Sequence, residues 1–410
     1  MIKRNQMLLF SRIVFFVFTV CLLGVRCQKP VDEKKKFSVT VYINPTSSGT
    51  VNLDPGGNEF QSSANVKITA LPAQGFQFSH WTGDLTGSLE NEKLVMTENK
   101  FVTAHFKPLT PAGPDFSLTG YATLNGGTTG GAGGQTVIAN NLTELNNYCN
   151  SDLPLIIQLN KKLISTGTKI IVGNNKSIIG VGTEAELEGV GFEIRSKNII
   201  IRNIKMSKVL NAFNAGDCIR IMDGASNIWI DHCEFFNESP ATQLDKDKYD
   251  GLVDATGTSS YITISWCIFR DHWKSNLVGS SESDNYNRRI TFHHNYWKNI
   301  NSRTPSYRYG EAHIFNCLYE NVDGGINSRM GACIKVENNV FRSVKNPIAA
   351  LDTDTNGGWM ISRNVFVNCT GLQPVSSTCS LNIPYHYSNV LHETTEVEQL
   401  VKQWAGTGKL

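Results

Sequence analysis

Ile228-Trp-Ile-Asp-His-Cys-Glu-Phe235 and Ile262-Thr-Ile-Ser-Trp-Cys-Ile-Phe269 share a pattern that decides the fold. In both stretches apolar residues stand at positions 1, 3 and 8, and a cysteine stands at position 6. Five more copies carry Cys, Asn or Ile at position 6, and they begin at Ile199, Ile290, Ala312, Ile334 and Trp359. Successive copies start 29, 34, 28, 22, 22 and 25 residues apart.

This repeat predicts an all-β fold, a right-handed parallel β-helix. Alternate residues of a strand point to the same side, and the recurrence of one strand pattern is typical of stacked coils. The 22-residue interval is a bare coil, and the longer intervals hold inserted loops. Position 6 then forms an internal ladder in which asparagine amides bond between coils. Cys233, Cys267 and Cys317 are core thiols in this ladder rather than metal ligands or nucleophiles.

The two ends of such a stack leave strand edges that have to be covered. Leu142-Thr-Glu-Leu145 begins a stretch that predicts a short N-terminal helix. Near the other end, helical spacing of apolar residues predicts a C-terminal helix that packs against the coils. These residues are Val397, Leu400, Val401 and Trp404.

Residues 1–26 have the features of a signal peptide. Basic residues precede an apolar run from Ile13 to Leu23, which is too short for a comfortable membrane span. We therefore expect an exported protein: secreted, periplasmic or a surface lipoprotein of a bacterium. Cys27 resembles an acylated lipoprotein cysteine, although Arg26 departs from the small residue that such signals prefer. Membrane anchoring through a lipidated Cys27 and simple cleavage with release both stay open.

The charge balance gives no sign of a nucleic-acid partner. The formal charge of +2 becomes −2 without residues 1–26, because they hold four basic residues and no acidic residue. The cysteines after Cys27 show no CxxC spacing, which argues against a structural zinc site. Export permits disulfides, and we expect the first of them between Cys369 and Cys379.

Residues 37–107 predict a separate small β-rich domain. Alternating stretches are separated by turn signals such as Asp54-Pro-Gly-Gly57. Three prolines within residues 108–115 predict a stiff linker. The β-helix then covers residues 116–410.

Four strings in the small domain carry a resemblance to a known module. They are Val66-Lys-Ile-Thr-Ala70, Gly75-Phe-Gln-Phe78, Trp81-Thr-Gly-Asp84 and Val102-Thr-Ala-His-Phe106. Together they resemble the bacterial surface repeat module related to internalin B repeats, which implies a spacer or an adhesion role. We expect Trp81 to pack in the core rather than to stack on a sugar ring.

Six charged residues lie in or beside the loops of the repeat, where a rigid stack presents functional groups. They are Asp217, Asp250, Asp254, Lys274, Arg303 and Arg308. Stacking brings residues that are far apart in sequence onto one wall. Three carboxylates on that wall would repel one another, so a divalent cation is expected among them. Singly, an Asp pair is more often a solvated turn and an RxPxxR stretch a salt-bridge loop, but their joint occurrence in order favours a functional site.

Longer strings extend a resemblance from about residue 116 to the end of the chain. They are Gly126-Gly-Thr-Thr-Gly-Gly131, Asn175-Lys-Ser-Ile-Ile-Gly-Val-Gly182, Asn198-Ile-Ile-Ile-Arg-Asn203, Trp229-Ile-Asp-His232, Asp250-Gly-Leu-Val-Asp254, Lys274 and Arg303-x-Pro305-x-x-Arg308. In this order they resemble the pectate lyases of polysaccharide lyase family 1. The resemblance implies Ca²⁺-dependent cleavage of polygalacturonate by β-elimination, which leaves 4,5-unsaturated oligogalacturonides. We expect the protein to act as a monomer.

The resemblance also implies roles for individual residues. The calcium-binding acids are Asp217, Asp250 and Asp254. Substrate is bound by Lys274 and Arg308, and Arg303 is the base that abstracts the C5 proton. An arginine base predicts an alkaline optimum, because the ordinary pKa of a guanidinium lies far above neutral pH. Ala215 stands where some members have a further calcium-binding acid, so calcium affinity without substrate is expected to be weaker.

Three other functions stay open. A pectin lyase would cleave methyl-esterified pectin without metal, although the three retained acids argue against it. A β-helical polygalacturonase would hydrolyse the same polymer with paired acids. A non-catalytic surface adhesin would bind the polysaccharide without turnover. We interpret Asp231, His232, His293 and His294 as framework residues. For Arg329 a contact with substrate stays open, and we favour a structural salt bridge.

Overall fold

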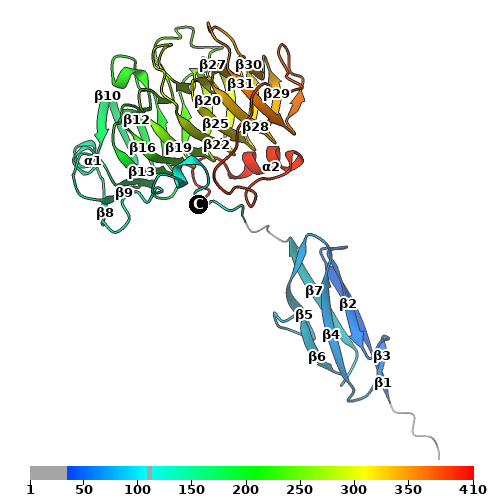
Figure 1. The fold of residues 1–410 in the computed structure, drawn as a ribbon. Helices are drawn as coiled ribbons and strands as arrows, with labels where there is room; N and C mark the ends of the chain where they lie inside the picture. The colour runs from blue at the N-terminus through cyan, green and yellow to red at the C-terminus, as the bar shows by residue number, and fades with distance from the viewer. Residues whose placement is uncertain (1–34, 109–112) are drawn as a thin grey trace, which may run out of the picture. The chain divides into compact units, whose positions relative to one another are not determined.

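The computed structural model describes residues 35–108 and 113–410, and the predicted signal peptide and Cys27 lie outside this part of the chain. The chain divides into two compact units between Gly113 and Pro114 (Figure 1). Among the described residues, no helix has both the length and the apolar character that a membrane span requires.

The first unit is a small β domain built from two sheets. One sheet has the strand order β3-β1-β7-β5 and the other the order β2-β4-β6. The strands are β1 (Lys36–Asn44), β2 (Gly49–Asp54), β3 (Glu59–Gln61), β4 (Asn65–Pro72), β5 (Phe76–Gly83), β6 (Asn91–Val95) and β7 (Lys100–Pro108). Trp81 is only 1% exposed, and its indole N–H donates to the carbonyl of Leu89 at 2.9 Å. The prediction that Trp81 belongs to the core is therefore confirmed.

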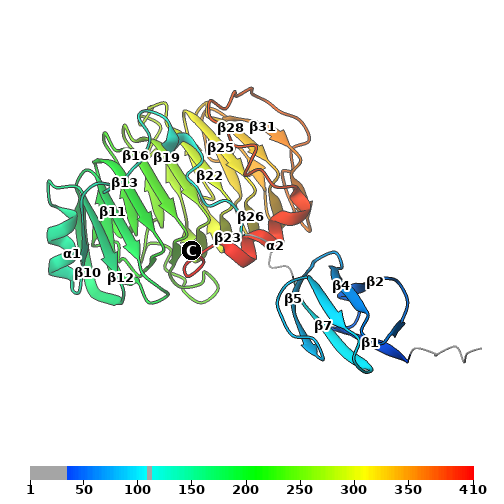
Figure 2. The same ribbon diagram turned by 90° about the horizontal axis from the view of Figure 1, so that it is seen from below.

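The second unit is a parallel β-helix, which confirms the predicted fold class (Figures 1 and 2). A typical coil contributes one strand to each of three parallel stacks. Stack 1 consists of β8 (Gln135–Ile138), β9 (Leu155–Leu159), β11 (Lys176–Gly180), β13 (Lys197–Arg202), β16 (Ser226–Asp231), β19 (Ser260–Ser265), β22 (Arg289–His293), β25 (Glu311–Phe315), β28 (Cys333–Glu337) and β31 (Gly358–Ser362).

Stacks 2 and 3 form the other walls of the coil. Stack 2 consists of β14 (Lys205–Ser207), β17 (Glu234–Phe236), β20 (Ile268–Lys274), β23 (Tyr296–Ser302), β26 (Leu318–Val322), β29 (Val340–Val344) and β32 (Val365–Val367). Stack 3 consists of β10 (Lys162–Val172), β12 (Glu186–Ile194), β15 (Ile219–Ile221), β18 (Val253–Ala255), β21 (Leu277–Val278), β24 (Ser306–Arg308), β27 (Ile326–Arg329) and β30 (Ile348–Ala349). Strand β12 pairs with both β14 and β15, so it joins the two stacks in one sheet.

The recurring sequence pattern spans the corner between stacks 1 and 2. Positions 1 and 3 lie in a strand of stack 1, position 8 lies in a strand of stack 2, and position 5 has a left-handed backbone. The φ angle is 48° at His232, 51° at Trp266 and 55° at His294. Such a backbone is unfavourable for bulky residues. Here the rings stack from coil to coil, with centroids 5.8 Å apart for the first pair and 4.1 Å for the second.

The predicted ladder at position 6 is confirmed. The side chain of Asn295 accepts from the amide of Cys267 at 2.9 Å and donates to the carbonyl of Ile264 at 2.8 Å. Asn339 repeats this bridge between Cys317 and Ile314 of the preceding coil. The three core thiols predicted from the pattern are fully buried, as expected.

Position 8 forms an aromatic stack inside the β-helix. Consecutive rings lie 4.5 to 5.3 Å apart and are nearly parallel, in the order Phe235, Phe269, Trp297, Tyr319, Phe341 and Phe366. Each stacked pair adds about 0.5–1.5 kcal/mol beyond its burial. The stack fixes the register of the coils, and it therefore sets the loops of consecutive coils side by side on the outer surface.

Both predicted helices are present. Helix α1 (Leu142–Cys149) is capped by Asn141, whose side chain accepts from the Glu144 amide, and it packs beside β9 and β10. Helix α2 (Thr394–Trp404) buries Val397 and Val401 against stack 2. It therefore lies along the side of the coils rather than over the edge of the last strand.

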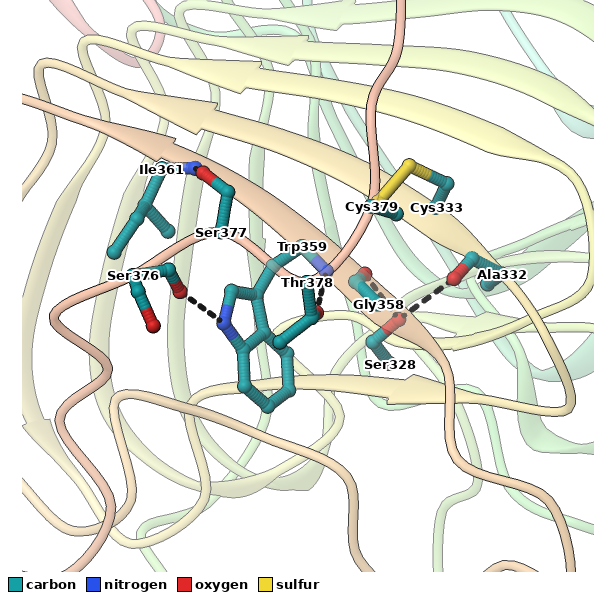
Figure 3. Close-up of a disulfide and its surroundings, with 10 residues drawn as sticks. All are labelled: Ser328, Ala332, Cys333, Gly358, Trp359, Ile361, Ser376, Ser377, Thr378 and Cys379. Carbon is teal, nitrogen blue, oxygen red and sulfur yellow. Dashed lines mark hydrogen bonds between the residues drawn. A yellow bond between two sulfur atoms is a disulfide. The ribbon is translucent and has the colours of Figure 1, made fainter.

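Residues 376–379 cover the edge of β31 instead (Figure 3). The backbone N–H of Trp359 donates to Thr378 Oγ1 at 3.0 Å, and the N–H of Thr378 donates back to the Trp359 carbonyl at 2.7 Å. A disulfide between Cys333 and Cys379, with Cα atoms 6.0 Å apart, fastens this segment to β28.

The expected disulfide between Cys369 and Cys379 is wrong. Cys369 follows β32 in stack 2, where its thiol is free and points toward the carbonyl of Phe341 at 3.3 Å. Cys379 lies against stack 1, beside Cys333. The nine residues between Cys369 and Cys379 cross from one stack to another, so proximity in sequence does not bring the two sulfur atoms together.

Candidate active site

The candidate site lies where the chain passes from stack 2 to stack 3. Asp217 follows the short helix η2 (Asn214–Gly216) and precedes β15. Asp250 ends the long loop before β18, and Asp254 is the central residue of that strand. Strands β15 and β18 pair in parallel, so acids that are far apart in sequence meet on one wall.

Two of these acids face the same point. Asp217 is 3% exposed and accepts from the amide of Gly251 at 2.7 Å. Asp254 is 4% exposed and accepts from the amide of Leu277 at 2.8 Å. A Cβ atom added to Gly251 would lie 2.6 Å from Asp217 Oδ1 and 2.4 Å from Asp254 Oδ1. The two carboxylates therefore close on a small space that only glycine leaves open.

The buried acids disfavour each other's charge. Burial raises the pKa of Asp217 well above its ordinary value, and the nearby Asp254 and Asp250 raise it further. Burial raises the pKa of Asp254 to about 7, although Arg303 opposes the rise. A hard divalent cation between these oxygen atoms would relieve the repulsion, so the donor set fits Ca²⁺. Within residues 35–108 and 113–410, however, no three His, Cys, Asp or Glu side chains are gathered closely enough to hold a metal ion.

Asp250, the third predicted acid, does not complete this group because two basic side chains hold it. Its Oδ1 lies 2.9 Å from Nζ of Lys274, the last residue of β20, and 3.4 Å from Nη1 of Arg303. Burial opposes the charge of Lys274, but hydrogen bonds with Asp247 and Asp250 outweigh it and raise the pKa of the ammonium group. Two cations therefore hold Asp250 beside the acid pair.

Arg303 lies in the short connection between β23 and β24, with φ of 64°. Its side chain is 26% exposed, so the guanidinium can reach both Asp250 and solvent. A pocket of about 270 Å³ opens beside it, lined by residues 301–303, 323–327, 345–346, 349 and 351–352. The arginine thus stands between the acids and a depression that extends over the following coils.

Arg308 is not in contact with the acids. It ends β24, is 9% exposed, and donates from Nη1 to the carbonyl of Gly279 at 2.9 Å. Burial lowers the pKa of its guanidinium, and the neighbouring Arg329 and Arg303 lower it further. The predicted residues thus form two contact groups, Asp217 with Asp254 and Asp250 with Lys274 and Arg303. Arg308, in β24 of stack 3, bonds to Gly279 instead.

Sequence reasoning missed three polar residues at this site. Asp247 pairs with Lys274 at 2.8 Å, and Arg220 lies 3.9 Å from Asp217. His272 lies 2.6 Å from the carbonyl oxygen of Asp250. The only available signal was position: Asp247 and His272 stand two or three residues before residues that the motifs select.

The framework interpretation holds for the histidines but not for Arg329. Asp231 accepts from Arg202 and from Ser265, both at 2.6 Å, and lies 2.7 Å from His232. His293 and His294 are buried, and their Nδ1 atoms lie 3.0 Å apart. The predicted salt bridge of Arg329 is wrong: its guanidinium donates to the carbonyl of Asp352 and pairs with no acid of the described chain.

Comparisons with known proteins identify the family of each part of the chain. The sequence profile described as pectate lyase matches residues 101–410, and the one described as divergent InlB B-repeat domain matches residues 39–110. Pectate trisaccharide-lyase of Bacillus licheniformis is 48% identical over 307 residues, which cover 72% of this chain and 88% of the relative. Pectate lyase A of Emericella nidulans is 38% identical over 313 residues, which cover 75% and 91% of the two chains.

Solved structures extend the comparison to the fold. A pectate lyase from Bacillus sp. N165, in complex with trigalacturonate, has a TM-score of 0.67 and 36% identity, over 72% of this chain and 99% of that chain. Pectate lyase C from Erwinia chrysanthemi, solved with Ca²⁺, has a TM-score of 0.62 at 24% identity, over 72% and 97% of the two chains, and supports the fold alone. The chain therefore belongs to the pectate lyase family of enzymes.

Proposed function

We propose that the β-helix cleaves polygalacturonate by calcium-dependent β-elimination. The observation that carries this proposal is the buried pair Asp217 and Asp254, which face one point beside the cations Lys274 and Arg303. The relatives supply the substrate class: one is named a pectate trisaccharide-lyase, and another was solved with trigalacturonate. The carboxylates of an acidic sugar can bind both a cation and basic side chains, and this surface offers the two side by side.

The chemistry follows from the charges on this wall. Ca²⁺ held by Asp217, Asp250 and Asp254 would supply a Lewis acid for the carboxylate attached to C5 of the substrate. Lys274 and Arg308 bind the sugar carboxylates and stabilise the negative charge that builds up when C5 loses its proton. The C5–H and C4–O bonds break, the C4–C5 double bond forms, and the leaving oxygen gains a proton. No water is consumed.

Arg303 takes the C5 proton in this scheme, so its guanidinium has to be neutral beforehand. The ordinary pKa of arginine lies far above neutral pH, and Asp250 Oδ1 lies 3.4 Å from Arg303 Nη1. A cation that engages Asp250 would free Arg303 from this ion pair. We therefore expect an alkaline optimum that depends on calcium.

The test follows the ultraviolet absorbance of unsaturated product from polygalacturonate at alkaline pH, with calcium or with a chelator. We expect product only with calcium, and about 10²–10⁴-fold less in Arg303→Lys. Arg363→Lys, at a side chain that is 58% exposed, is the matched control and should keep full activity. Absence of any absorbance gain with calcium would overturn the proposal.

The same assay separates the other functions. Activity that survives the chelator and rises with methyl esterification would select a pectin lyase. New reducing ends without unsaturated product would select a hydrolase. Polymer binding without any product, equal in wild type and Arg303→Lys, would select an adhesin.

We also propose that the enzyme is exported and meets its polymer outside the cytoplasm. The proposal rests on residues 1–26 and on the size of the polymer, which cannot cross a membrane. Cys27 is the proposed site of a lipid anchor. Metabolic labelling with a fatty acid tests it: label in wild type and none in Cys27→Ser supports anchoring, and absence of label in both supports release.

A further inference from the structure

His272 is buried directly behind the loop that carries Asp250. It is 1% exposed, and its two ring nitrogens have separate partners. Nε2 lies 2.6 Å from the carbonyl oxygen of Asp250, and Nδ1 lies 3.3 Å from Nδ2 of Asn237. Asn237 in turn accepts from the backbone N–H of Lys208 at 2.5 Å. One hydrogen-bonded chain therefore crosses three consecutive coils.

The partners fix the direction of every bond in this chain. The Asp250 carbonyl can only accept, so His272 Nε2 carries the proton. Nδ1 of the neutral ring then accepts from the Asn237 amide, and the Asn237 oxygen accepts from Lys208. In all three bonds the donor hydrogen points toward Asp250, and hydrogen bonds aligned in this way polarise and strengthen one another.

These three hydrogen bonds connect the three segments that carry the site. Lys208 begins the connection that leads to Asp217, Asn237 begins the loop that ends at Asp250, and His272 precedes Lys274 by two residues. The N–H of Asp250 also donates to the carbonyl of Gly216 at 3.2 Å. The peptide groups on both sides of Asp250 are therefore held, one from the Asp217 segment and one from β20.

We propose that His272, supported by Asn237, is a positioning residue that sets the calcium affinity of the site. This inference rests on the proposed function, since it takes Asp250 as a calcium-binding acid. His272 holds the backbone of Asp250 so that its carboxylate can join Asp217 and Asp254, and it touches neither the cation nor the sugar. Groups that orient metal ligands in this way typically change metal affinity by about 10–100-fold when they are removed.

The test is calorimetric titration of full-length enzyme with Ca²⁺ in the absence of substrate. We expect His272→Leu and Asn237→Ala to weaken calcium binding by about 10–100-fold. His272→Gln should recover most of the affinity, because its amide nitrogen can donate to the Asp250 carbonyl in place of Nε2. The turnover number at saturating calcium should stay within a few-fold of wild type in all three variants.

His293→Leu is the matched control, because His293 is equally buried but lies on stack 1. It should lower thermal stability and leave calcium affinity unchanged. Unchanged calcium affinity in His272→Leu, or equal weakening in His272→Leu and His272→Gln, would overturn the inference while the proposed function stands. Failure of the wild type to bind calcium would overturn both. If His272→Leu does not fold, Asn237→Ala and His272→Gln still give the comparison.

Discussion

Lys274 Nζ lies 2.9 Å from Asp250 Oδ1, so an ammonium group and a carboxylate of the same site form an ion pair in the structure. The two side chains come from neighbouring coils, β20 and the loop before β18. Since the proposed function gives Asp250 to a cation and Lys274 to the sugar, binding has to separate this pair. Cation and lysine are therefore competitors for one carboxylate.

Lys274→Met should strengthen calcium binding in the absence of substrate while it lowers turnover. An ion pair that is partly exposed is worth at most about 1 kcal/mol, which limits the gain in calcium affinity to about fivefold. Turnover should fall because the sugar carboxylate loses an ammonium partner. Calcium titration and initial rates on polygalacturonate measure the two effects. Lys298→Met, which removes a surface pair with Glu320, should change neither, and weaker calcium binding in Lys274→Met would contradict the competition.

Gly251→Ala should abolish calcium binding and leave the fold intact. The added methyl would lie 2.4 Å from Asp254 Oδ1 and 2.6 Å from Asp217 Oδ1, so it would fill the space that the two carboxylates face. The loss should appear in calcium titration and in product formation. Gly56→Ala is the control, because a methyl there meets no atom closer than 3.9 Å. Normal calcium affinity in Gly251→Ala would show that the cation binds elsewhere.

Cys379→Ser should destabilise the β-helix by about 2–4 kcal/mol under non-reducing conditions, because a cross-link between residues 46 positions apart constrains the unfolded chain. Urea unfolding measures the loss. Cys333→Ser should give the same value, and the double variant should add nothing further. Cys369→Ser should lower stability less, since that thiol is free. Equal effects of Cys369→Ser and Cys379→Ser would mean that the disulfide is not formed.

The fold should lose stability in acid through His293. Burial lowers the pKa of His293 to about 3, with Asp231 opposing and His313 and His232 adding to the shift. The unfolded histidine keeps a pKa of about 6.5. Between these values the unfolded chain takes up a proton that the folded chain refuses. The contribution of His293 is therefore complete above pH 6.5 and is lost as the pH falls toward 3.

The expected slope is about 1.4 kcal/mol per pH unit over that window. His293→Phe removes the titrating group and preserves the stack on Phe315, whose ring centroid lies 5.0 Å away. Urea unfolding between pH 4 and pH 7 should therefore show a shallower loss in the variant. His386→Phe, at an exposed position, should leave the slope unchanged. An unchanged slope in His293→Phe would show that His293 does not resist protonation in the folded state.

Much of the fold could be predicted because it is periodic. Positions 1, 3, 6 and 8 recur in register, so the ladder at Asn295 and Asn339 and the core thiols follow from the pattern alone. The helix at Leu142 was predictable from local composition. The route of the segment after β32 was not, because nothing in its sequence indicates which stack it joins, and the disulfide partner of Cys379 was therefore predicted wrongly.

The site was predictable as a set of residues but not as a set of contacts. The motifs place Asp217, Asp250 and Asp254 on one wall, because stacking brings consecutive loops together. Which cation each acid faces depends on rotamers and on inserted loops. Asp247 and His272 lie among other polar residues in stretches without periodicity, so only the structure identifies them as partners of the site.

The cover on β31 has a consequence for the behaviour of many copies of the enzyme together. Residues 376–379 already occupy the outer hydrogen-bonding groups of that strand, and the bond between Cys333 and Cys379 keeps them there. A bare parallel coil would offer a template onto which the first coil of another molecule could dock, and the process would continue end to end as a fibril. Residues 376–379 thus block such pairing at β31, and reduction of the bond between Cys333 and Cys379 would loosen them.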